Sequence, residues 1–337
     1  MIKSLVTGGA GFIGAHVSYH LNKIGHNVIV LDDCSGGYEE NVPMSTTFVK
    51  GSIMDVDLIE KLFKKYKFTY VFHLAAYAAE GLSHFIRIFN YNNNLIGSIN
   101  LINASVRYEV QCFVFASSIA VYGKGELPFK EDIKVTPVDP YGIAKLAIEQ
   151  DLATAYDMFG LNYIVFRPHN VYGEYQNIGD PYRNVVGIFM NQLLQKNPLT
   201  IFGDGNQTRA FSHIDDVAPQ IARSVEIPEA YNKIFNIGAD KDYSVNELSQ
   251  KVIEAMGIDG SIRYLESRNE AVHAYSDHTK LNEVFQVDRD SSVPLEEGLS
   301  KMAKWVKTVG VRKSETFENI EIKKNIPPFW LNEVLNK

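Results

Sequence analysis

The stretch that decides the fold is "IKSLVTGGAGFIGAHVSYHLNKIGHNVIVLDD", residues 2–33. Residues 2–6 and 28–31 are short apolar runs typical of buried strands. The segment between them carries apolar residues at helical spacing and breaks at Gly25. A strand, a helix and a second strand in this order predict a βαβ unit at the start of the chain.

The turn between the first strand and the helix is rich in glycine. It reads Gly9-x-Gly11-x-x-Gly14, and an acid, Asp32, ends the next strand 18 residues after the last glycine. Glycines at these positions let the backbone approach a pyrophosphate, and the helix N-terminus faces the phosphates. Strand, glycine turn, helix and acid together form the context that a dinucleotide-binding fingerprint requires.

The same segment discriminates between cofactors. Asp32 can accept hydrogen bonds from both hydroxyls of the adenosine ribose, and it would repel a 2′-phosphate. No Lys or Arg occurs from Asp32 to Val49 that could neutralise such a phosphate. The sequence therefore favours NAD over NADP.

Further apolar runs follow at the spacing of an α/β protein. They lie at residues 70–74, 112–116, 163–166 and 234–237, and helical patterns separate most of them. This alternation predicts a Rossmann-type, doubly wound parallel sheet.

The second half of the chain departs from the regular alternation after about residue 168. We expect an NAD-binding domain made of residues 1–167 and 211–238. A smaller, discontinuous, C-terminal substrate domain would hold residues 168–210 and 239–337.

Composition excludes several classes of function. The chain has 337 residues, of which 45% are hydrophobic and 22% charged, and its formal net charge is −7. That charge argues against a nucleic-acid or anionic-membrane partner. The two cysteines, Cys34 and Cys112, form no CxxC pair, so we expect no disulfide framework and no metal site. With no long apolar run and no signal-like N-terminus, we expect a cytoplasmic protein.

A tyrosine and a lysine stand four positions apart in "PYGIAK", residues 140–145. On a helix, Tyr141 and Lys145 would lie one turn apart on the same face. The strand at 112–116 runs into Ser117 and Ser118, and strands of a doubly wound sheet end at the ligand crevice. The two serines are therefore expected near the cofactor.

With these motifs the chain resembles the nucleotide-sugar epimerases of the extended short-chain dehydrogenase/reductase superfamily, in particular the UDP-glucose 4-epimerase-like proteins. The resemblance covers nearly the whole chain. Its carriers are "TGGAGFIG" (7–14), "HLAA" (73–76), "SSIAVYG" (117–123), "PYGIAK" (140–145), "RPHNVYG" (167–173), "LTIFGDGNQTRAFSHIDDV" (199–217) and "FNIG" (235–238).

The resemblance implies a role for each of three sets of residues. The catalytic triad would be Ser118, Tyr141 and Lys145, with Ser117 structural. Cofactor-binding residues would be Gly8, Gly11, Phe12, Ile13, Gly14, Asp32, Asp33, Ser52, Ile53, Leu74, Ala75, Ala76, Tyr141, Lys145 and His169. Substrate-binding residues would be Ser118, Tyr141, Asn170, Asn184, Ile201, Phe202, Arg209, Arg268 and Ala274.

The chemistry of the triad can be argued from its side chains. An unperturbed tyrosine titrates near 10, so it is roughly 1,000-fold too protonated to act as a base at neutral pH. A pKa near 7 requires about 4 kcal/mol of preference for the phenolate. The Lys145 ammonium and an oxidised nicotinamide ring would both favour the phenolate, and Ser118 would hydrogen-bond the reacting hydroxyl.

Residues that the family's other reactions need are missing. Ile119 and Ala120 follow Ser118, where the 4,6-dehydratases carry an Asp-Glu pair and the decarboxylases a Glu. The GDP-mannose 3,5-epimerases use a cysteine and a lysine where this chain has Ala120 and a residue near Asn184. Inversion at C4 needs only the triad and NAD, so we expect a 4-epimerase of a UDP-hexose.

Other functions remain open at this point. A UDP-glucuronate 4-epimerase, a GDP-sugar epimerase or a ketone reductase would use the same triad. A protein that holds NAD without catalysing a reaction is the alternative from another class.

Several substrate-side features are less regular. Arg209 and Arg268 would bind the pyrophosphate, because a phosphate-rich ligand favours forked donors. Ala274 would leave room for an N-acetyl group at C2. The loop at 76–87 departs from the family pattern, and its Glu80 and Ser83 are candidate sugar contacts.

The remaining expectations concern structural roles. A structural role is the preferred interpretation of His73 and of His169, although the latter is also a candidate cofactor residue. Asp215 and Asp216 would cap a helix that starts at Val217. The family pattern implies a homodimer. The tail from residue 311 could cover an apolar surface or extend a subunit contact.

Overall fold

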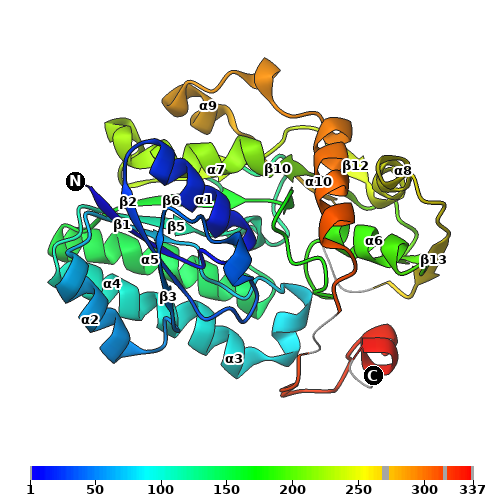
Figure 1. Ribbon diagram of the computed structural model, residues 1–337, viewed down its shortest axis with the longest axis horizontal. Helices are drawn as coiled ribbons and strands as arrows, with labels where there is room; N and C mark the ends of the chain where they lie inside the picture. The colour runs from blue at the N-terminus through cyan, green and yellow to red at the C-terminus, as the bar shows by residue number, and fades with distance from the viewer. Residues whose placement is uncertain (1, 268–272, 314–316, 335–337) are drawn as a thin grey trace.

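A computed structural model describes residues 2–267, 273–313 and 317–334. Its centre is a seven-stranded sheet with the strand order β11-β6-β5-β4-β1-β2-β3 (Figure 1). All six neighbouring pairs are parallel. The strands are β1 (Lys3–Thr7), β2 (Asn27–Asp32), β3 (Thr47–Lys50), β4 (Tyr70–His73), β5 (Cys112–Ala116), β6 (Asn162–Pro168) and β11 (Lys233–Ile237).

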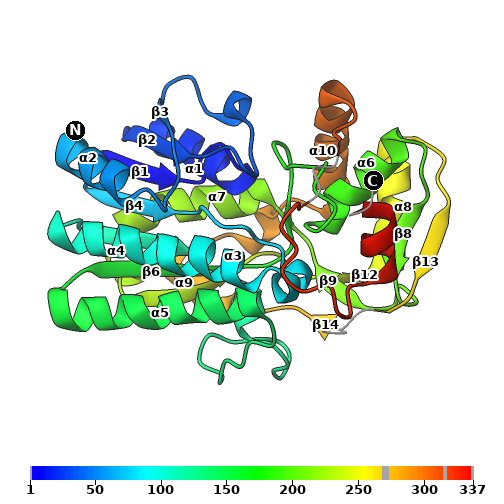
Figure 2. The same ribbon diagram turned by 90° about the horizontal axis from the view of Figure 1, so that it is seen from below.

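Helices cover both faces of this sheet, as a doubly wound fold requires (Figure 2). One face carries α1 (Phe12–Lys23), α7 (Ile214–Arg223) and α9 (Thr279–Phe285). The other carries α2 (Val56–Tyr66), α4 (Gly97–Arg107) and α5 (Pro140–Phe159). Each face has its own apolar core, and the predicted fold class is confirmed.

The strand order reverses direction between β1 and β4. Ligands of doubly wound sheets bind outside the carboxyl ends of the strands at such a switch point. The glycine turn follows β1, and the segment "LAA" follows β4, so both stand at this edge of the sheet.

The predicted strands are all present; the strand at 112–116 has the predicted ends, and the ends of the others differ by at most two residues. The sequence reading missed β3, whose four residues are each at least partly exposed. An edge strand of this length has no continuous apolar run, and its stability comes from pairing with β2.

A second group of elements packs beside the sheet (Figures 1 and 2). Its helices are α6 (Val185–Leu194), α8 (Val245–Met256) and α10 (Leu295–Val309). Its strands are β8 (Leu199–Phe202) paired with β13 (Ile262–Leu265), and β9 (Thr208–Ala210) between β12 (Asp242–Ser244) and β14 (His273–Ala274). The three helices share one apolar core, which includes Phe189, Leu248 and Met302. The proposed domain boundaries stay a prediction.

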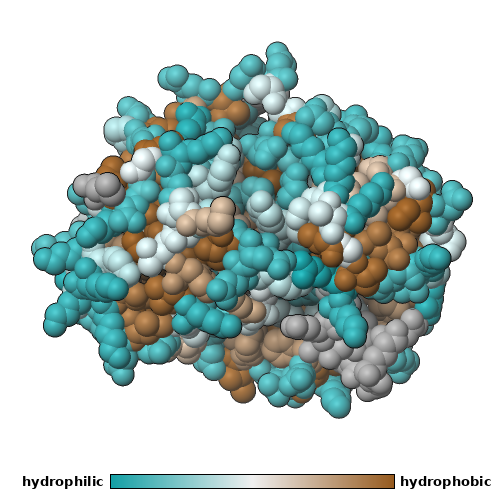
Figure 3. Space-filling view, in the orientation of Figure 1, coloured by the Kyte–Doolittle hydropathy of each residue, from teal (hydrophilic) through white to brown (hydrophobic). Residues whose placement is uncertain are grey.

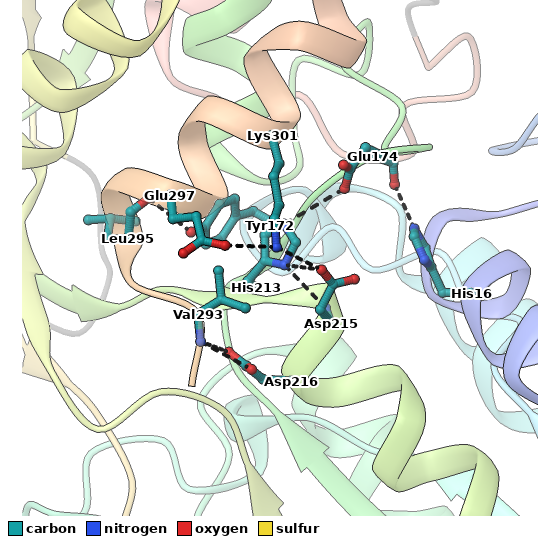
Figure 4. A network of polar contacts seen from close by, with 10 residues as sticks. All are labelled: His16, Tyr172, Glu174, His213, Asp215, Asp216, Val293, Leu295, Glu297 and Lys301. Atoms are coloured by element: carbon teal, nitrogen blue, oxygen red, sulfur yellow. Dashed lines mark hydrogen bonds and ion pairs between the residues drawn. The ribbon is translucent and has the colours of Figure 1, made fainter. Parts of the chain in front are cut away.

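A polar network ties α10 to the start of α7 (Figure 4). The Lys301 ammonium lies 3.3 Å from the Asp215 carboxylate and 3.1 Å from that of Glu297. The buried His213 ring accepts a hydrogen bond from the Asp215 backbone amide at 3.3 Å, and its Nε2 faces the Glu174 carboxylate at 3.7 Å. These contacts hold the second group of elements against the sheet domain's helix layer.

The helix cap expected at Asp215 and Asp216 is wrong. The helix begins three residues earlier, at Ile214, and the His213 side chain caps it. Both aspartates lie in its first turn, where the helix dipole favours a negative charge. The apolar Ile214 is fully buried, and its burial extends the helix beyond the point that the acidic pair suggests.

Hydrophilic residues predominate on the face shown in Figure 3, with hydrophobic residues in scattered groups between them. Within the described residues, the search for a helix long and apolar enough to span a bilayer finds none.

Candidate active site

A cleft of about 540 Å³ runs along the carboxyl ends of the strands and continues between the sheet and the second group of elements. The glycine turn, the ends of β4 and β5, and the start of α5 line one side. Segments 168–185 and 200–211 line the other side. The cleft thus brings together residues that the sequence separates by up to 266 positions, from Gly8 to Ala274.

The glycine turn is packed as closely as its backbone allows. Gly8 has a φ of +74°, and a Cβ there would lie 2.7 Å from the backbone of Ala75. A Cβ on Gly14 would lie 2.1 Å from the carbonyl oxygen of Gly8. Side chains at these positions would push α1 away from the strand and close the space in front of the helix N-terminus. That space, lined by Gly11 and Phe12, fits a pyrophosphate.

Asp32 stands at the end of β2 on the wall of the cleft. Its carboxylate accepts hydrogen bonds from the backbone amides of Ala10 at 3.0 Å and Cys34 at 2.8 Å. Burial raises the pKa of Asp32, and these amides oppose the rise. Since Asp32 lines the cleft, its carboxylate oxygens can also accept hydrogen bonds from the free hydroxyls of a ribose.

The structure brings nearly all the predicted cofactor residues to the cleft wall. Ser52 is an exception, because its neighbours Gly51 and Ile53 line the cleft while its own hydroxyl accepts a hydrogen bond from the Met54 amide at 3.2 Å. Lys145 lies behind the wall. The cofactor residues that line it are Gly8, Gly11, Phe12, Ile13, Gly14, Asp32, Asp33, Ile53, Leu74, Ala75, Ala76, Tyr141 and His169.

The Tyr141 side chain stands at the start of α5, as the spacing predicts. Asp139 caps this helix, since its carboxylate accepts a hydrogen bond from the Gly142 amide at 2.8 Å, and Pro140 occupies the first turn. Tyr141 and Ser118, which follows the end of β5, both line the cleft, and the Ser118 side chain is near enough to favour the phenolate form of Tyr141. The two reactive hydroxyls therefore meet where strand and helix both face the cleft.

Lys145 lies one turn further along α5 and is fully buried. Its ammonium donates a hydrogen bond to the Ala116 carbonyl at 2.7 Å. It lies 4.6 Å from the centre of the Phe115 ring and 5.7 Å from that of Tyr141. The helical spacing thus places phenol and ammonium on the same face, as predicted.

The electrostatics of the pair differ from the expectation. Burial raises the pKa of Tyr141, and the nearby Ser118 side chain opposes this rise. Burial also lowers the pKa of Lys145 to about 7, and the charge of Glu149 opposes that change. The protein by itself therefore keeps Tyr141 protonated at neutral pH, because both charged forms lose their hydration in this buried place.

A buried ion pair beneath Lys145 escaped the sequence reading. The Arg167 guanidinium donates to both oxygens of the Glu149 carboxylate, at 3.0 and 2.5 Å, and both side chains are at most 3% exposed. Ser117 donates a hydrogen bond to the same carboxylate. Glu149 follows Lys145 by four residues, so the two side chains lie on the same face of the helix, and this spacing could have indicated that Glu149 is near the site.

The two histidines singled out in the sequence have structural partners. His73 lies between the hydroxyls of Thr7 and Ser98, each 2.7 Å from a ring nitrogen. His169 lines the cleft, and its Nε2 lies 3.0 Å from that of His278. Burial lowers the pKa of both His73 and His169 to about 3, so both rings are neutral.

The predicted substrate residues share the far part of the cleft. Arg209 and Ala274 are paired neighbours on β9 and β14. Arg268 lies outside the described residues. Those that line the cleft are Ser118, Tyr141, Asn170, Asn184, Ile201, Phe202, Arg209 and Ala274.

The two predicted substrate asparagines both have positive φ, 40° for Asn170 and 52° for Asn184. The side chain of Asn170 donates to the Ala210 carbonyl at 3.2 Å, and that of Asn184 donates to Val171. Asn184 also precedes the first residue of α6. These bonds hold both loop residues at the cleft wall.

The further residues that line this part of the cleft without having been predicted include Tyr77, Tyr182 and Arg183. The Arg183 guanidinium lies over the Tyr77 ring at 4.9 Å and pairs with the Asp180 carboxylate at 2.7 Å. They belong to loops whose sequence follows no motif. Glu80 lines the cleft as well, whereas the Ser83 hydroxyl donates to the Glu80 carbonyl at 2.6 Å behind it.

Comparison with known proteins finds one matching family. Residues 4–238 match the model of the NAD dependent epimerase/dehydratase family. The UDP-glucose 4-epimerase of Mycolicibacterium smegmatis is 33% identical over 310 residues, which cover 89% of this chain and 97% of that protein.

Two solved structures extend the comparison. The UDP-glucose 4-epimerase of Thermotoga maritima with UDP-glucose has a TM-score of 0.85 and 35% identity, covering 91% of this chain and 99% of that one. The UDP-glucuronic acid 4-epimerase of Bacillus cereus, in complex with UDP-glucuronic acid and NAD, has a TM-score of 0.84 and 27% identity, covering 91% and 100%. The relatives thus include epimerases of more than one UDP-sugar.

Proposed function

The chain belongs to the NAD dependent epimerase/dehydratase family, and we propose that it inverts C4 of a UDP-hexose, interconverting UDP-glucose and UDP-galactose. The observation that carries this proposal is that Ser118 and Tyr141 line the same part of the cleft, with the Lys145 ammonium 5.7 Å from the centre of the Tyr141 ring. Beside them, Ile119 and Ala120 line the cleft. Neither side chain can transfer a proton, so this part of the site offers no second acid or base for elimination or decarboxylation.

NAD is the cofactor of the family, and its residues in this chain are the glycine turn, Asp32 and the segments after β4 and β5. When bound, it supplies the capacity to accept a hydride from the sugar and to return it. The glycine turn would hold the pyrophosphate at the N-terminus of α1, and Asp32 would accept hydrogen bonds from the ribose.

Tyr141 performs the proton transfer in the proposed reaction. It removes the proton from the C4 hydroxyl as C4 is oxidised to a ketone, and it gives the proton back when the ketone is reduced from the other face. Ser118 donates a hydrogen bond to the reacting oxygen. The positive charge of Lys145 stabilises the phenolate, offsetting part of the penalty that burial imposes.

One ion pair in the cleft favours a neutral hexose over a uronic sugar as the substrate. A C6 carboxylate would need a cation, and Arg183 is a guanidinium on the cleft wall. This guanidinium already pairs with the Asp180 carboxylate at 2.7 Å, which neutralises most of its charge. UDP-glucuronate is therefore the second candidate, and Arg183 is the residue that would bind it.

A homodimer and a cytoplasmic location stay predictions. On α5, Ile143 is 42% exposed, and near the helix end Met158 and Phe159 are 73% and 66% exposed. Exposed apolar side chains on one helix suit a subunit contact. Ile148 and Leu152 of the same helix are fully buried against the sheet, so they do not contribute to such a surface.

The experiment that tests the function is product analysis without added cofactor. Purified protein is incubated with UDP-glucose, UDP-N-acetylglucosamine and UDP-glucuronate in separate reactions. We expect the C4 epimer of UDP-glucose to form, with no accumulation of NADH. A product that keeps its C4 configuration, or a strict need for added NADH, would contradict a 4-epimerase.

A further inference from the structure

The segment that follows α10 packs onto both sides of the proposed nucleotide-sugar site. In Figures 1 and 2 it runs from α10 toward α3 (Arg87–Tyr91) and ends near β8. The superposition with the Thermotoga maritima epimerase includes 99% of that protein but only 91% of this chain. About a tenth of this chain therefore has no counterpart there. The segment after α10 has about that length.

Its first part binds the first turn of α3 and the residues just before it. The Glu321 carboxylate accepts hydrogen bonds from the backbone amides of Ile88 at 2.8 Å and Phe89 at 2.9 Å. The Glu321 amide donates to the Phe85 carbonyl at 2.9 Å. The Phe317 ring lies 5.5 Å from that of Tyr77, a residue of the cleft wall.

Its last part binds the opposite side of the cleft. Trp330 is 2% exposed, and its ring lies 5.2 Å from that of Tyr182 and 6.2 Å from that of Phe202. The Phe329 ring lies 6.3 Å from Phe202. Tyr182 and Phe202 both line the cleft. Residues on the cleft's two sides therefore share one apolar cluster with Trp330.

A second cavity, of about 860 Å³, separates part of this segment from β13. It meets the main cleft at Gly81, His84 and Phe202. Phe202 is thus a partition between the two spaces, and the aromatic rings of Phe329 and Trp330 contact it from the far side.

We propose that residues 317–334 form a fixed wall behind the base end of the nucleotide-sugar site, in which Trp330 is a positioning residue that holds Phe202 and Tyr182 against the substrate. This inference rests on the proposed function and on the substrate-binding role that the family resemblance implies for Phe202, which we place beside the nucleotide base. Because Trp330 contacts neither the reacting hydroxyls nor Lys145, it acts on substrate binding rather than on the chemical step. Trp330 is buried, and the Glu321 carboxylate accepts two backbone hydrogen bonds, so both ends of the segment are fixed to the protein. These contacts indicate a wall that stays in place.

The test is calorimetric titration of the full, NAD-loaded chain with UDP, together with steady-state kinetics on UDP-glucose. In Trp330→Ala we expect Kd for UDP and KM for UDP-glucose to rise on the order of tenfold. The bound NAD and kcat at saturation should not change, which is the pattern of lost uniform binding. Trp330→Phe, which keeps an aromatic ring, should restore most of the affinity.

The chain offers a matched control in its other tryptophan. Trp305 on α10 packs against Tyr175, with ring centres 6.1 Å apart, and its substitution by alanine should leave the UDP affinity unchanged. If Trp330→Ala does not fold, the smaller change Trp330→Leu is judged by the same criteria.

The outcomes separate the two proposals. A native protein that binds no UDP contradicts the proposed function itself. A native protein that binds UDP, with a Trp330 variant that binds it equally tightly, overturns the wall and leaves the function standing. A variant that loses kcat with unchanged KM also overturns the wall, because it would place Trp330 in the chemical step.

Discussion

The Lys145 ammonium lies 5.7 Å from the centre of the Tyr141 ring, while it donates its hydrogen bond to the Ala116 carbonyl 2.7 Å away. The lysine is therefore fixed by the strand end, and in the proposed mechanism it would act on the phenol through its charge and not through a hydrogen bond. Burial raises the pKa of Tyr141 and lowers that of Lys145 to about 7. Because the pair is buried, a second positive charge, that of an oxidised nicotinamide ring, would favour the Tyr141 phenolate more strongly here than in water.

Removing the Tyr141 hydroxyl tests its role in proton transfer. Tyr141→Phe keeps the ring and its packing, so the variant should fold and retain NAD. Its kcat should fall by about 100- to 10,000-fold, the usual contribution of general acid–base catalysis. Steady-state kinetics on UDP-glucose, with circular dichroism as the folding control, measures this. A kcat near that of the native protein would mean that another group transfers the proton.

Removing the charge of Lys145 tests its effect on the phenol. Lys145→Met keeps a chain of similar length but takes away the positive charge, so the pKa of Tyr141 should rise further. Activity needs the phenolate, and the deprotonated fraction at a given pH then falls. Residual activity should therefore reach its optimum at a higher pH than in the native protein. A kcat profile against pH measures this, and an unmoved optimum would separate Lys145 from the titration of Tyr141.

The sequence predicted the parts of the site that depend on local spacing. The glycine turn and Asp32 lie within one βαβ unit, and Tyr141 and Lys145 within one helical turn. Ser118 could be placed because a parallel strand must end at the ligand edge. Each of these predictions needs only the geometry of one or two adjacent elements.

Features that depend on distant partners could not be predicted in this way. The Glu149 carboxylate pairs with Arg167 on a neighbouring strand, and Trp330 meets Phe202 across 128 positions of sequence. The raised pKa of Tyr141 arises from burial by several elements at once. The start of α7 depends on the burial of Ile214, which no local capping pattern reveals.

The buried ion pair under Lys145 should be strongly coupled. Glu149→Gln alone leaves the Arg167 guanidinium buried without its charge partner, and we expect a loss of about 3–5 kcal/mol in the free energy of unfolding. In the double variant Glu149→Gln with Arg167→Met, the uncompensated charge is gone and part of that stability should return. Urea unfolding of both variants and of Arg167→Met alone gives the coupling energy. Additive losses would show that the two side chains stabilise the fold independently.

The small side chain of Ala274, at the proposed position of the sugar's C2 substituent, should decide whether an N-acetyl sugar is accepted. Ala274 lines the cleft beside Arg209 and belongs to an apolar cluster that includes Tyr122 and Phe129. We expect the native enzyme to accept UDP-N-acetylglucosamine as well as UDP-glucose, and Ala274→Tyr to remove activity on the N-acetyl sugar selectively. The measurement is kcat/KM for both sugars in both proteins. Equal losses on both sugars, or a native enzyme inactive on the N-acetyl sugar, would show that Ala274 does not control this choice.

The most direct test of the central claim follows the hydrogen at C4. UDP-glucose carrying deuterium at C4 is incubated with the purified protein without added NAD, and the UDP-hexose products are separated and analysed by mass spectrometry. Oxidation and reduction by one bound cofactor predict UDP-galactose that keeps its deuterium, with no NADH released. UDP-galactose that has lost the deuterium to solvent, or a 4-keto product with the deuterium left on the cofactor, would contradict the account.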